Sequence, residues 1–126
     1  MPEREHDRIV DAVGRLTNLT QSGELKWSLQ SYPYGDTGVI GPIYRAEHKG
    51  RMLRLRKCEV EVEESRSWRK RAQEVRYVLD FVDENNNSIW AFPASDAVEH
   101  LYDAVGYQTA GVSEYLDDLL KREDEE

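Results

Sequence analysis

The chain has 126 residues, of which 39% are hydrophobic and 33% charged, and its formal net charge is -8. This length fits one domain with a single core. No apolar run reaches the roughly 18 residues of a membrane-spanning helix, and the charged N-terminus lacks the apolar core of a signal peptide. The composition therefore predicts one cytoplasmic domain over residues 1–126, with a frayed acidic tail at 121–126 and no membrane partner.

The charge is unevenly distributed along the chain. Residues 43–76 contain eleven Lys and Arg against six acidic residues, whereas the rest contains six basic and nineteen acidic residues. A basic centre between acidic ends can support docking between copies. Cys58 is the only cysteine, which excludes an intrachain disulfide and a paired-Cys metal site. It lies in a strand-like run and is expected to behave as a small apolar residue.

Apolar residues at helical spacing predict an amphipathic helix over Pro2–Ser22. The stripe consists of Ile9, Val13, Leu16 and Thr20, widened by Val10 and Leu19. Gly23 can supply the left-handed residue that commonly ends a helix. Leu25 and Trp27 alternate directly afterwards, so we expect them to fold back against the helix or to start a short strand.

Extended patterns follow at Val39–Glu47, which Gly41-Pro42 interrupts, and at Arg51–Glu63, with a turn between them. In the longer run the apolar residues change from odd positions (Leu53, Leu55) to even ones (Cys58, Val60, Val62). Side chains on a strand alternate with a period of two, so this change predicts a β-bulge or sharp bend near Arg56-Lys57.

Two more strands and two helices complete the pattern. Strands are predicted over Glu74–Val82 and Ser88–Phe92; in the first, Val75, Tyr77, Leu79 and Phe81 face the core. Ser95 is a candidate N-cap for a helix that buries Val98, Leu101, Tyr102 and Val105 and ends at or just after Gly106. Ser113 can cap a last helix whose apolar side holds Val112, Tyr115, Leu116, Leu119 and Leu120. The fold class is therefore α+β: an N-terminal helix, a three- to four-stranded antiparallel meander, and two C-terminal helices packed on one face.

Two stretches carry a family resemblance. Leu16, Leu19, Thr20, Gly23, Leu25 and Trp27 form the pattern L-x-x-L-T-x-x-G-x-L-x-W, and Leu101–Leu120 opens with L-Y-x-x-(A/V). Together they resemble a loose group of small, mostly uncharacterised prokaryotic proteins of mobile or accessory genetic regions. The resemblance implies the order helix, meander and helix pair, and it implies no particular activity. The structural interpretation of Thr20, Gly23 and Trp27 is a cap, a turn and a core plug.

No constellation in the sequence is typical of catalysis. His6, His48 and His100 fall in separate elements, and none has a second ligand at metal-binding spacing. There is no phosphate-binding glycine motif, and no nucleophile stands beside a base. The sequence therefore predicts no enzyme, no cofactor and no metal.

Two loops are candidate binding sites. The loop 65–71 surrounds Trp68 with Arg66, Arg69, Lys70 and Arg71, a combination that suits single-stranded nucleic acid, a nucleotide or another anionic partner. Arg45, Lys49, Arg51, Arg54 and Arg56 could extend it if the strands align. The alternative is a solvated hairpin loop whose Trp68 folds onto the core.

The second loop, residues 31–38, contains Tyr32, Tyr34 and Asp36 among glycines. Aromatic rings and exposed backbone amides can line a small-molecule pocket. The alternative is that both tyrosines cover the edge of the core.

The leading hypothesis is a non-catalytic interaction or regulatory module that forms a homodimer or binds a protein partner. A meander has edge strands that need protection, and pairing between copies is one common solution. A nucleic-acid or nucleotide binder and a small-molecule sensor are the alternatives.

Overall fold

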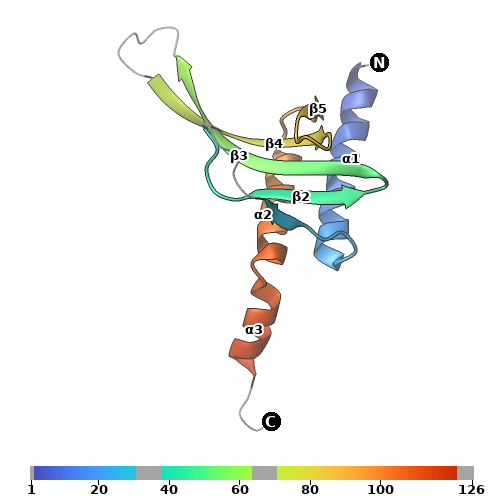
Figure 1. The fold of residues 1–126 in the computed structure, drawn as a ribbon, viewed down its shortest axis with the longest axis vertical. Helices are drawn as coiled ribbons and strands as arrows, with labels where there is room; N and C mark the ends of the chain where they lie inside the picture. The colour runs from blue at the N-terminus through green and yellow to red at the C-terminus, as the bar shows by residue number, and fades with distance from the viewer. Residues whose placement is uncertain (1, 31–37, 64–70, 122–126) are drawn as a thin grey trace.

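The computed structural model describes residues 2–30, 38–63 and 71–121. Its elements are α1 (Pro2–Ser22), β1 (Ser28–Gln30), β2 (Ile43–His48), β3 (Arg51–Glu63), β4 (Arg71–Val82), β5 (Ser88–Ala91), α2 (Asp96–Thr109) and α3 (Val112–Leu120). All strands belong to one antiparallel sheet in the order β1-β2-β3-β4-β5 (Figure 1). The predicted α+β class and the meander are confirmed, although the sheet has five strands where three or four were expected.

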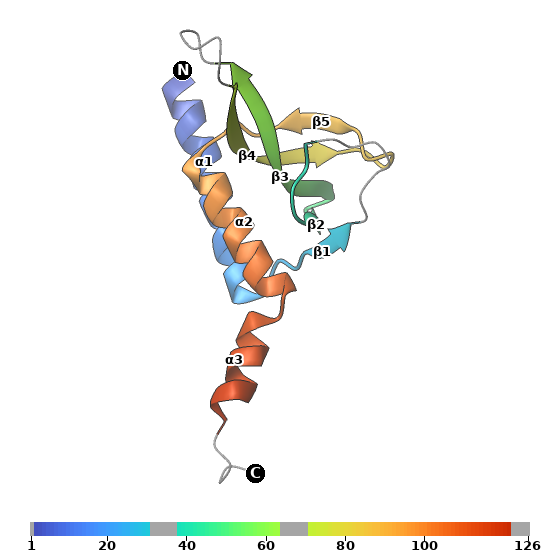
Figure 2. The ribbon, with the colours of Figure 1, turned by 90° about the vertical axis from the view of Figure 1, so that its left-hand side faces the viewer.

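The helical layer consists of α1 and α2, which run side by side along one side of the sheet (Figure 2). α1 contributes Val13 and Leu16 to the core, and α2 contributes Val98, Leu101 and Val105, all of them buried as the 3.6-residue period requires. From the sheet, Leu53, Leu55 and Leu79 pack into the same core. α2 contacts β3 and β4, so it is the helix that joins α1 to the sheet.

A row of tyrosines fixes α2 on the sheet. The Tyr102 ring lies 5.5 Å from that of Tyr44 and 5.2 Å from that of Tyr77, measured between centroids. One turn further along α2, a Cβ on Gly106 would come within 3.4 Å of the Tyr44 hydroxyl. The missing side chain leaves room for the Tyr44 hydroxyl beside α2. Gly106 lies inside the helix, which continues to Thr109.

The end of α1 is tied to α2 by a polar contact that we call the Gln108 clamp. The Gln108 amide nitrogen donates to the carbonyls of Thr20 (2.9 Å) and Leu25 (2.8 Å), and its amide oxygen accepts from the Trp27 backbone N–H (2.9 Å). The Trp27 indole N–H donates to the Thr20 hydroxyl at 3.0 Å. Trp27 is only 7% exposed, so the prediction that it folds back against α1 is confirmed.

Of the two alternatives predicted near Arg56-Lys57, a β-bulge or a sharp bend, the bulge is wrong. β3 and β4 pair without a register shift from Met52↔Val82 to Glu63↔Arg71. Beyond Lys57 the helix side of the hairpin is no longer covered, since Glu59 and Val75 are exposed there, and polar residues can occupy it. The apolar residues change face because the helices no longer cover the hairpin there. The alternation of side chains along the backbone continues without interruption as β3 and β4 curve away from the helices (Figure 1).

The irregularity lies instead in the strand beside β3. β2 pairs with Arg51–Leu55, and the chain before it pairs again with β3 through Ile40 N–H to the Lys57 carbonyl at 2.9 Å. Gly41 and Pro42 separate the two paired stretches, and Gly41 has a positive φ of 78° that favours glycine.

The expectation that both C-terminal helices pack on the sheet is wrong for α3. None of the residues of α3, all of which the structure describes, is buried, and α3 projects from the body beyond the end of α2 (Figures 1 and 2). Gly111, at φ 67°, is the residue that ends α2 and starts α3, where Ser113 was expected as the cap. The left-handed turn at Gly111 directs the chain away from the sheet. Within the described residues, no helix combines the length and apolar content needed to cross a membrane.

Candidate functional site

The sheet face opposite α1 and α2, which we call the open face, carries an unusual set of arginines. Strand register places Arg45 of β2 directly opposite Arg54 of β3, and Arg54 directly opposite Asp80 of β4. Arg56 follows two residues after Arg54 and therefore lies on the same face. Three guanidinium groups and one carboxylate thus lie on neighbouring strands of one face, and two of the three, Arg54 and Arg56, reach the carboxylate.

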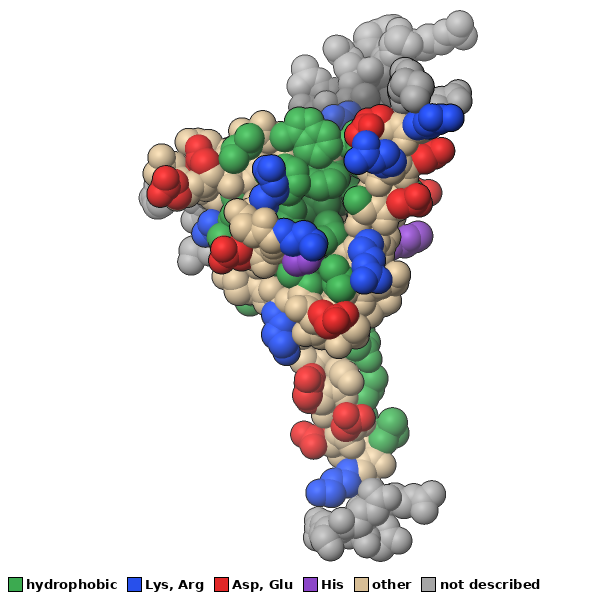
Figure 3. All heavy atoms as spheres, turned by 90° about the vertical axis from the view of Figure 1, so that its right-hand side faces the viewer, with side chains coloured by type: hydrophobic (Ala, Val, Ile, Leu, Met, Phe, Trp, Pro, Cys, Tyr) green, Lys and Arg blue, Asp and Glu red, His purple; other side chains and the backbone are tan. Residues whose placement is uncertain are grey.

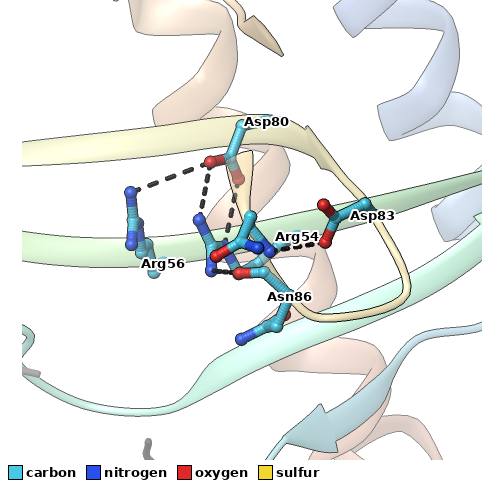
Figure 4. Close-up of polar contacts among 6 residues, drawn as sticks. Arg54, Arg56, Asp80, Asp83 and Asn86 are labelled. Atoms are coloured by element: carbon cyan, nitrogen blue, oxygen red, sulfur yellow. Dashed lines mark hydrogen bonds and ion pairs between the residues drawn. The ribbon is translucent and has the colours of Figure 1, made fainter. Parts of the chain in front are cut away.

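Asp80 and Arg54 form a buried pair at the centre of this group (Figure 4). Arg54 donates Nε–H to Asp80 Oδ1 at 3.2 Å and Nη2–H to Oδ2 at 2.8 Å, a two-point geometry that suits guanidinium and carboxylate. Arg54 is 6% exposed and Asp80 1% exposed. At that depth each charge depends on the other, because an isolated buried charge is very costly.

The turn between β4 and β5 folds over Arg54 and completes its hydrogen bonding. The Asn86 carbonyl accepts from Arg54 Nη1–H at 3.0 Å, with Asn86 itself at a left-handed φ of 68°. Asp83 holds the turn by accepting from the backbone N–H groups of Asn87 (2.8 Å) and Asn85 (2.9 Å). These hydrogen bonds, that from Asn87 first, lower the pKa of Asp83 from its ordinary value.

The other two arginines are less completely bonded. Arg56 reaches Asp80 only at 3.8 Å, from Nη2 to Oδ2. The Nε–H groups of Arg45 and Arg56 are both buried, and neither has a hydrogen-bond partner. The side-chain oxygens of Gln30 and Asn86 share this condition. Buried polar atoms are normally paired, so four unpaired ones in the part of the chain that the structure describes, all at the open face or the turn above it, are a site-like feature.

The structure divides the predicted basic patch. Arg45, Arg54 and Arg56 come together on the open face, as the alignment of strands allowed. Arg51 lies on the opposite face, where its guanidinium carbon is 5.2 Å from the centre of the Phe81 ring. Lys49 lies in the β2–β3 turn at a φ of 53°. The strands therefore do not align all five cations on one face, and three of them form the cluster.

The two predicted binding loops fall mostly outside the described residues. Arg66, Trp68, Arg69 and Lys70 lie there, as do Tyr32, Tyr34 and Asp36. Arg71 begins β4, and only its backbone is described. The nucleic-acid interpretation of 65–71 and the small-molecule interpretation of the Tyr32 and Tyr34 loop stay predictions.

Asp80 is the residue that sequence reasoning missed. Alternation with the core-facing Leu79 and Phe81 predicts that Asp80 points to the other side of its strand, yet it is almost completely buried. The signal was present in its neighbours on that side, Val78 and Val82, which make the outward side half apolar. An acidic residue between two valines on one strand face indicates a buried cationic partner, and Arg54 is that partner.

The described residues offer little else for chemistry. No group of three His, Cys, Asp or Glu among them is arranged to hold a metal ion. His6 and His100 are exposed on α1 and α2, and His48 lies in β2, so the structure keeps the histidines in separate elements. Cys58 is half-buried in β3.

Two apolar surfaces remain exposed. The first, the α3 stripe, consists of Tyr115 (64% exposed), Leu116 (38%), Leu119 (62%) and Leu120 (75%). The second, the aromatic surface, consists of Phe81, Trp90 and Phe92, whose ring centroids lie 4.9 to 6.1 Å apart. Trp90 is 44% exposed, and Arg51 lies against Phe81. Seen from the side that carries α1 and β5, hydrophobic side chains gather in one area with Lys and Arg around it (Figure 3).

Comparison with protein-family models, with curated proteins and with solved structures found no match for this chain.

Proposed function

We propose that the protein is a non-catalytic, cytoplasmic interaction module that self-associates, with the α3 stripe of one copy docked on the aromatic surface of a second copy. The observation that carries this proposal is the α3 stripe itself. A short amphipathic helix gains most of its stability by packing its apolar side, and α3 has no such packing within the described residues. Its apolar side chains are exposed at 38 to 75% and lie on one side of the helix.

Charge supports the aromatic surface as the partner of α3. α3 carries Glu114, Asp117 and Asp118 on its polar side and no basic residue in its last turn. Arg51 lies over the Phe81 ring of the aromatic surface, and on that side of the molecule Lys and Arg side chains lie next to the hydrophobic area, with Asp and Glu side chains further among them (Figure 3). Docking α3 there brings opposite charges together at the rim, which favours encounter and orientation.

Pairing of α3 with α3 is the less favourable arrangement. On a helical projection Asp117 and Asp118 flank the stripe on its two sides, so two such helices would bring like charges together along both edges. Burying one Leu or Tyr side chain contributes about 1.5–3 kcal/mol, while association costs about 4–15 kcal/mol. One α3 contact therefore barely offsets this cost, and a reciprocal exchange with two contacts is the arrangement that we propose.

Light scattering coupled to size-exclusion chromatography tests the proposal. We expect a dimer for the wild type and a monomer for Leu119→Glu, which places a charge in the middle of the stripe. Glu114→Gln is the matched control, because it changes the charge by the same amount on the polar side of the same helix and should leave the dimer intact. A wild-type monomer at high micromolar concentration, or equal effects of both variants, contradicts the proposal.

Mixing two defective variants identifies the partner surface. Trp90→Ser damages the aromatic surface and keeps α3, whereas Leu119→Glu does the reverse. Neither variant alone should associate. Their equimolar mixture should form a heterodimer that is much weaker than the wild-type dimer and is populated only at high protein concentration, because it keeps one of the two contacts. If α3 instead pairs with α3, Trp90→Ser stays dimeric alone and the mixture shows no rescue.

A further inference from the structure

The unpaired polar atoms of the open face, two donors and one acceptor, surround one point of the sheet. Ile43 of β2 is 1% exposed and forms the floor. Gln30 is its partner on β1, Arg56 lies across from it on β3, and Arg45 is two residues further along β2 on the same face. Three polar side chains from three adjacent strands therefore surround a buried apolar residue, and each has a buried polar atom without a hydrogen-bond partner.

This arrangement has more positive charge than its own carboxylate can neutralise. Arg45, Arg54 and Arg56 contribute three positive charges, and Asp80 contributes one negative charge, most of which Arg54 uses at 2.8 Å. Glu47, the next acidic residue along β2 on this face, is exposed and forms no ion pair with Arg45 among the described residues. Counted over the residues that the structure describes, this local excess of two positive charges in a half-buried setting favours an anionic ligand of matching charge.

We propose that Arg45, Arg56 and Gln30 bind the phosphate group of a small ligand. Guanidinium groups donate to phosphate oxygens through paired N–H groups. A tetrahedral phosphate presents oxygens in several directions and can accept from two strands together, whereas a planar carboxylate suits a single fork such as that between Arg54 and Asp80. The unpaired Gln30 oxygen needs a donor. The O–H of hydrogenphosphate supplies one while that ion keeps two negative charges, and an ionised carboxylate supplies none.

Access and rigidity agree with this assignment. A surface depression lined by Ser28, Gln30, Arg45 and Met52 opens beside the cluster. The Asp80 carboxylate, held at depth by Arg54, anchors Arg56 at 3.8 Å and limits its motion. The arginines thus divide their roles: Arg54 is structural, and Arg45 and Arg56 are ligand-binding.

The test is a titration with inorganic phosphate at constant ionic strength, followed by isothermal calorimetry and by amide chemical shifts. Adenosine 5′-monophosphate and acetate form parallel arms. We expect saturable binding of inorganic phosphate or of the nucleotide, with shifts centred on β2 and β3, and no saturation by acetate. Phosphate binding alone indicates the free ion as the ligand, while tighter nucleotide binding indicates a phosphate ester.

The variants Arg45→Met and Arg56→Met should each weaken this binding about tenfold to a hundredfold, the effect of losing a charge-assisted hydrogen bond. Arg76→Met is the matched control, because Arg76 lies on the same face of the sheet but is exposed and paired with Glu74 at 3.1 Å. Its binding should be unchanged. Urea unfolding of all three variants establishes that they are folded.

Three results overturn the proposal: no saturation by either phosphate compound, equal binding of acetate, or an equal loss in Arg76→Met, which indicates a diffuse basic surface. Repeating the titration on monomeric Leu119→Glu separates this site from self-association. The phosphate site is expected to persist there, because it lies on the face away from the aromatic surface.

Discussion

The Gln108 clamp and the open-face arginine cluster are both polar groups inside an apolar setting, but they differ in how completely they are bonded. Each polar group of the Gln108 side chain has a partner at 2.8 to 2.9 Å, and the Trp27 indole is paired as well. On the other side of the sheet, Arg45 and Arg56 each keep a buried donor without one. Complete satisfaction is typical of a structural network, whereas unpaired donors beside excess charge are typical of a binding site.

Of the substitutions that compare these two regions, the one at Asp80 is expected to change the free energy of unfolding most. Asp80→Ala leaves the buried Arg54 guanidinium without its carboxylate and should lower the free energy of unfolding by about 3–5 kcal/mol. Urea denaturation measures this, with Asp96→Ala, an exposed acid at the start of α2, as the control. Replacing Arg54 and Asp80 together by leucine should recover much of the loss. If the single variant is near neutral, Asp80 is not the anchor of the cluster.

Trp27 comes next, on the clamp side. Trp27→Ala removes a large buried ring and the hydrogen bond to Thr20, so we expect a loss of about 3–5 kcal/mol, a large part of the 5–15 kcal/mol typical of such a domain. Trp68→Ala, in the loop 65–71 expected to be exposed, should cost less than about 1 kcal/mol. The reverse order of the two urea midpoints would mean that Trp68 is a core residue, and the nucleic-acid interpretation of that loop would fail with it.

Gln108→Met tests the clamp more selectively, because methionine has a similar shape and cannot form hydrogen bonds of this kind. Leaving the Trp27 N–H and two carbonyls without their partner should cost about 1–3 kcal/mol. The expected signature is faster amide exchange at Trp27 and Leu25. Tyr107→Met, on the exposed side of the same helix turn, is the control and should change neither quantity by much.

The double variant Arg45→Met, Arg56→Met provides the sharpest contrast with Gln108→Met. Removing two incompletely bonded charges should change the free energy of unfolding by less than about 1 kcal/mol, or even raise it, since apolar replacement of buried charges is often neutral or stabilising. A loss of several kcal/mol in a urea melt would assign both arginines to structure and would remove the argument for a ligand.

The smallest effect concerns Asp83, which holds the turn above Arg54. The pKa of Asp83 is lowered in the folded protein, so its contribution to stability is present above the unfolded value of 3.8 and is lost as the pH falls through the folded value. Amide shifts of Asn85 and Asn87 should therefore move only under acid conditions below that value. Asp83→Asn should abolish this titration, whereas Glu84→Gln, at the exposed neighbour, should leave it unchanged.

The sequence predicted the helical side of the molecule well because periodicity reports burial there. The stripe through Val13 and Leu16 and the return of Trp27 follow from the rule that covered positions are apolar. On β4 the rule holds at Leu79, but Val75, also predicted to face the core, is exposed. The same rule failed on β3, where the change of phase at Cys58 reflected the end of the helical cover and not a bulge.

The open face was harder to predict, since burial there depends on pairing between distant residues. Arg54 and Asp80 are buried only because strand register brings them together across 26 positions. The chain order shows neither the register nor which of the five basic residues share a face. α3 was misplaced for a related reason, because an apolar stripe indicates that a helix packs and does not identify its partner.

The Gln108 clamp also has a consequence for the order in which the chain can fold. Its hydrogen bonds join residues that lie 81, 83 and 88 positions apart, and α1 packs mainly against α2 near the other end of the chain. During synthesis α1 is made first, but the helix that covers its apolar side is made after the whole sheet. Contacts this distant form slowly and leave apolar surface exposed in the meantime. The apolar side of the N-terminal helix is therefore exposed for the longest time during synthesis, and the nascent chain is most vulnerable to aggregation there.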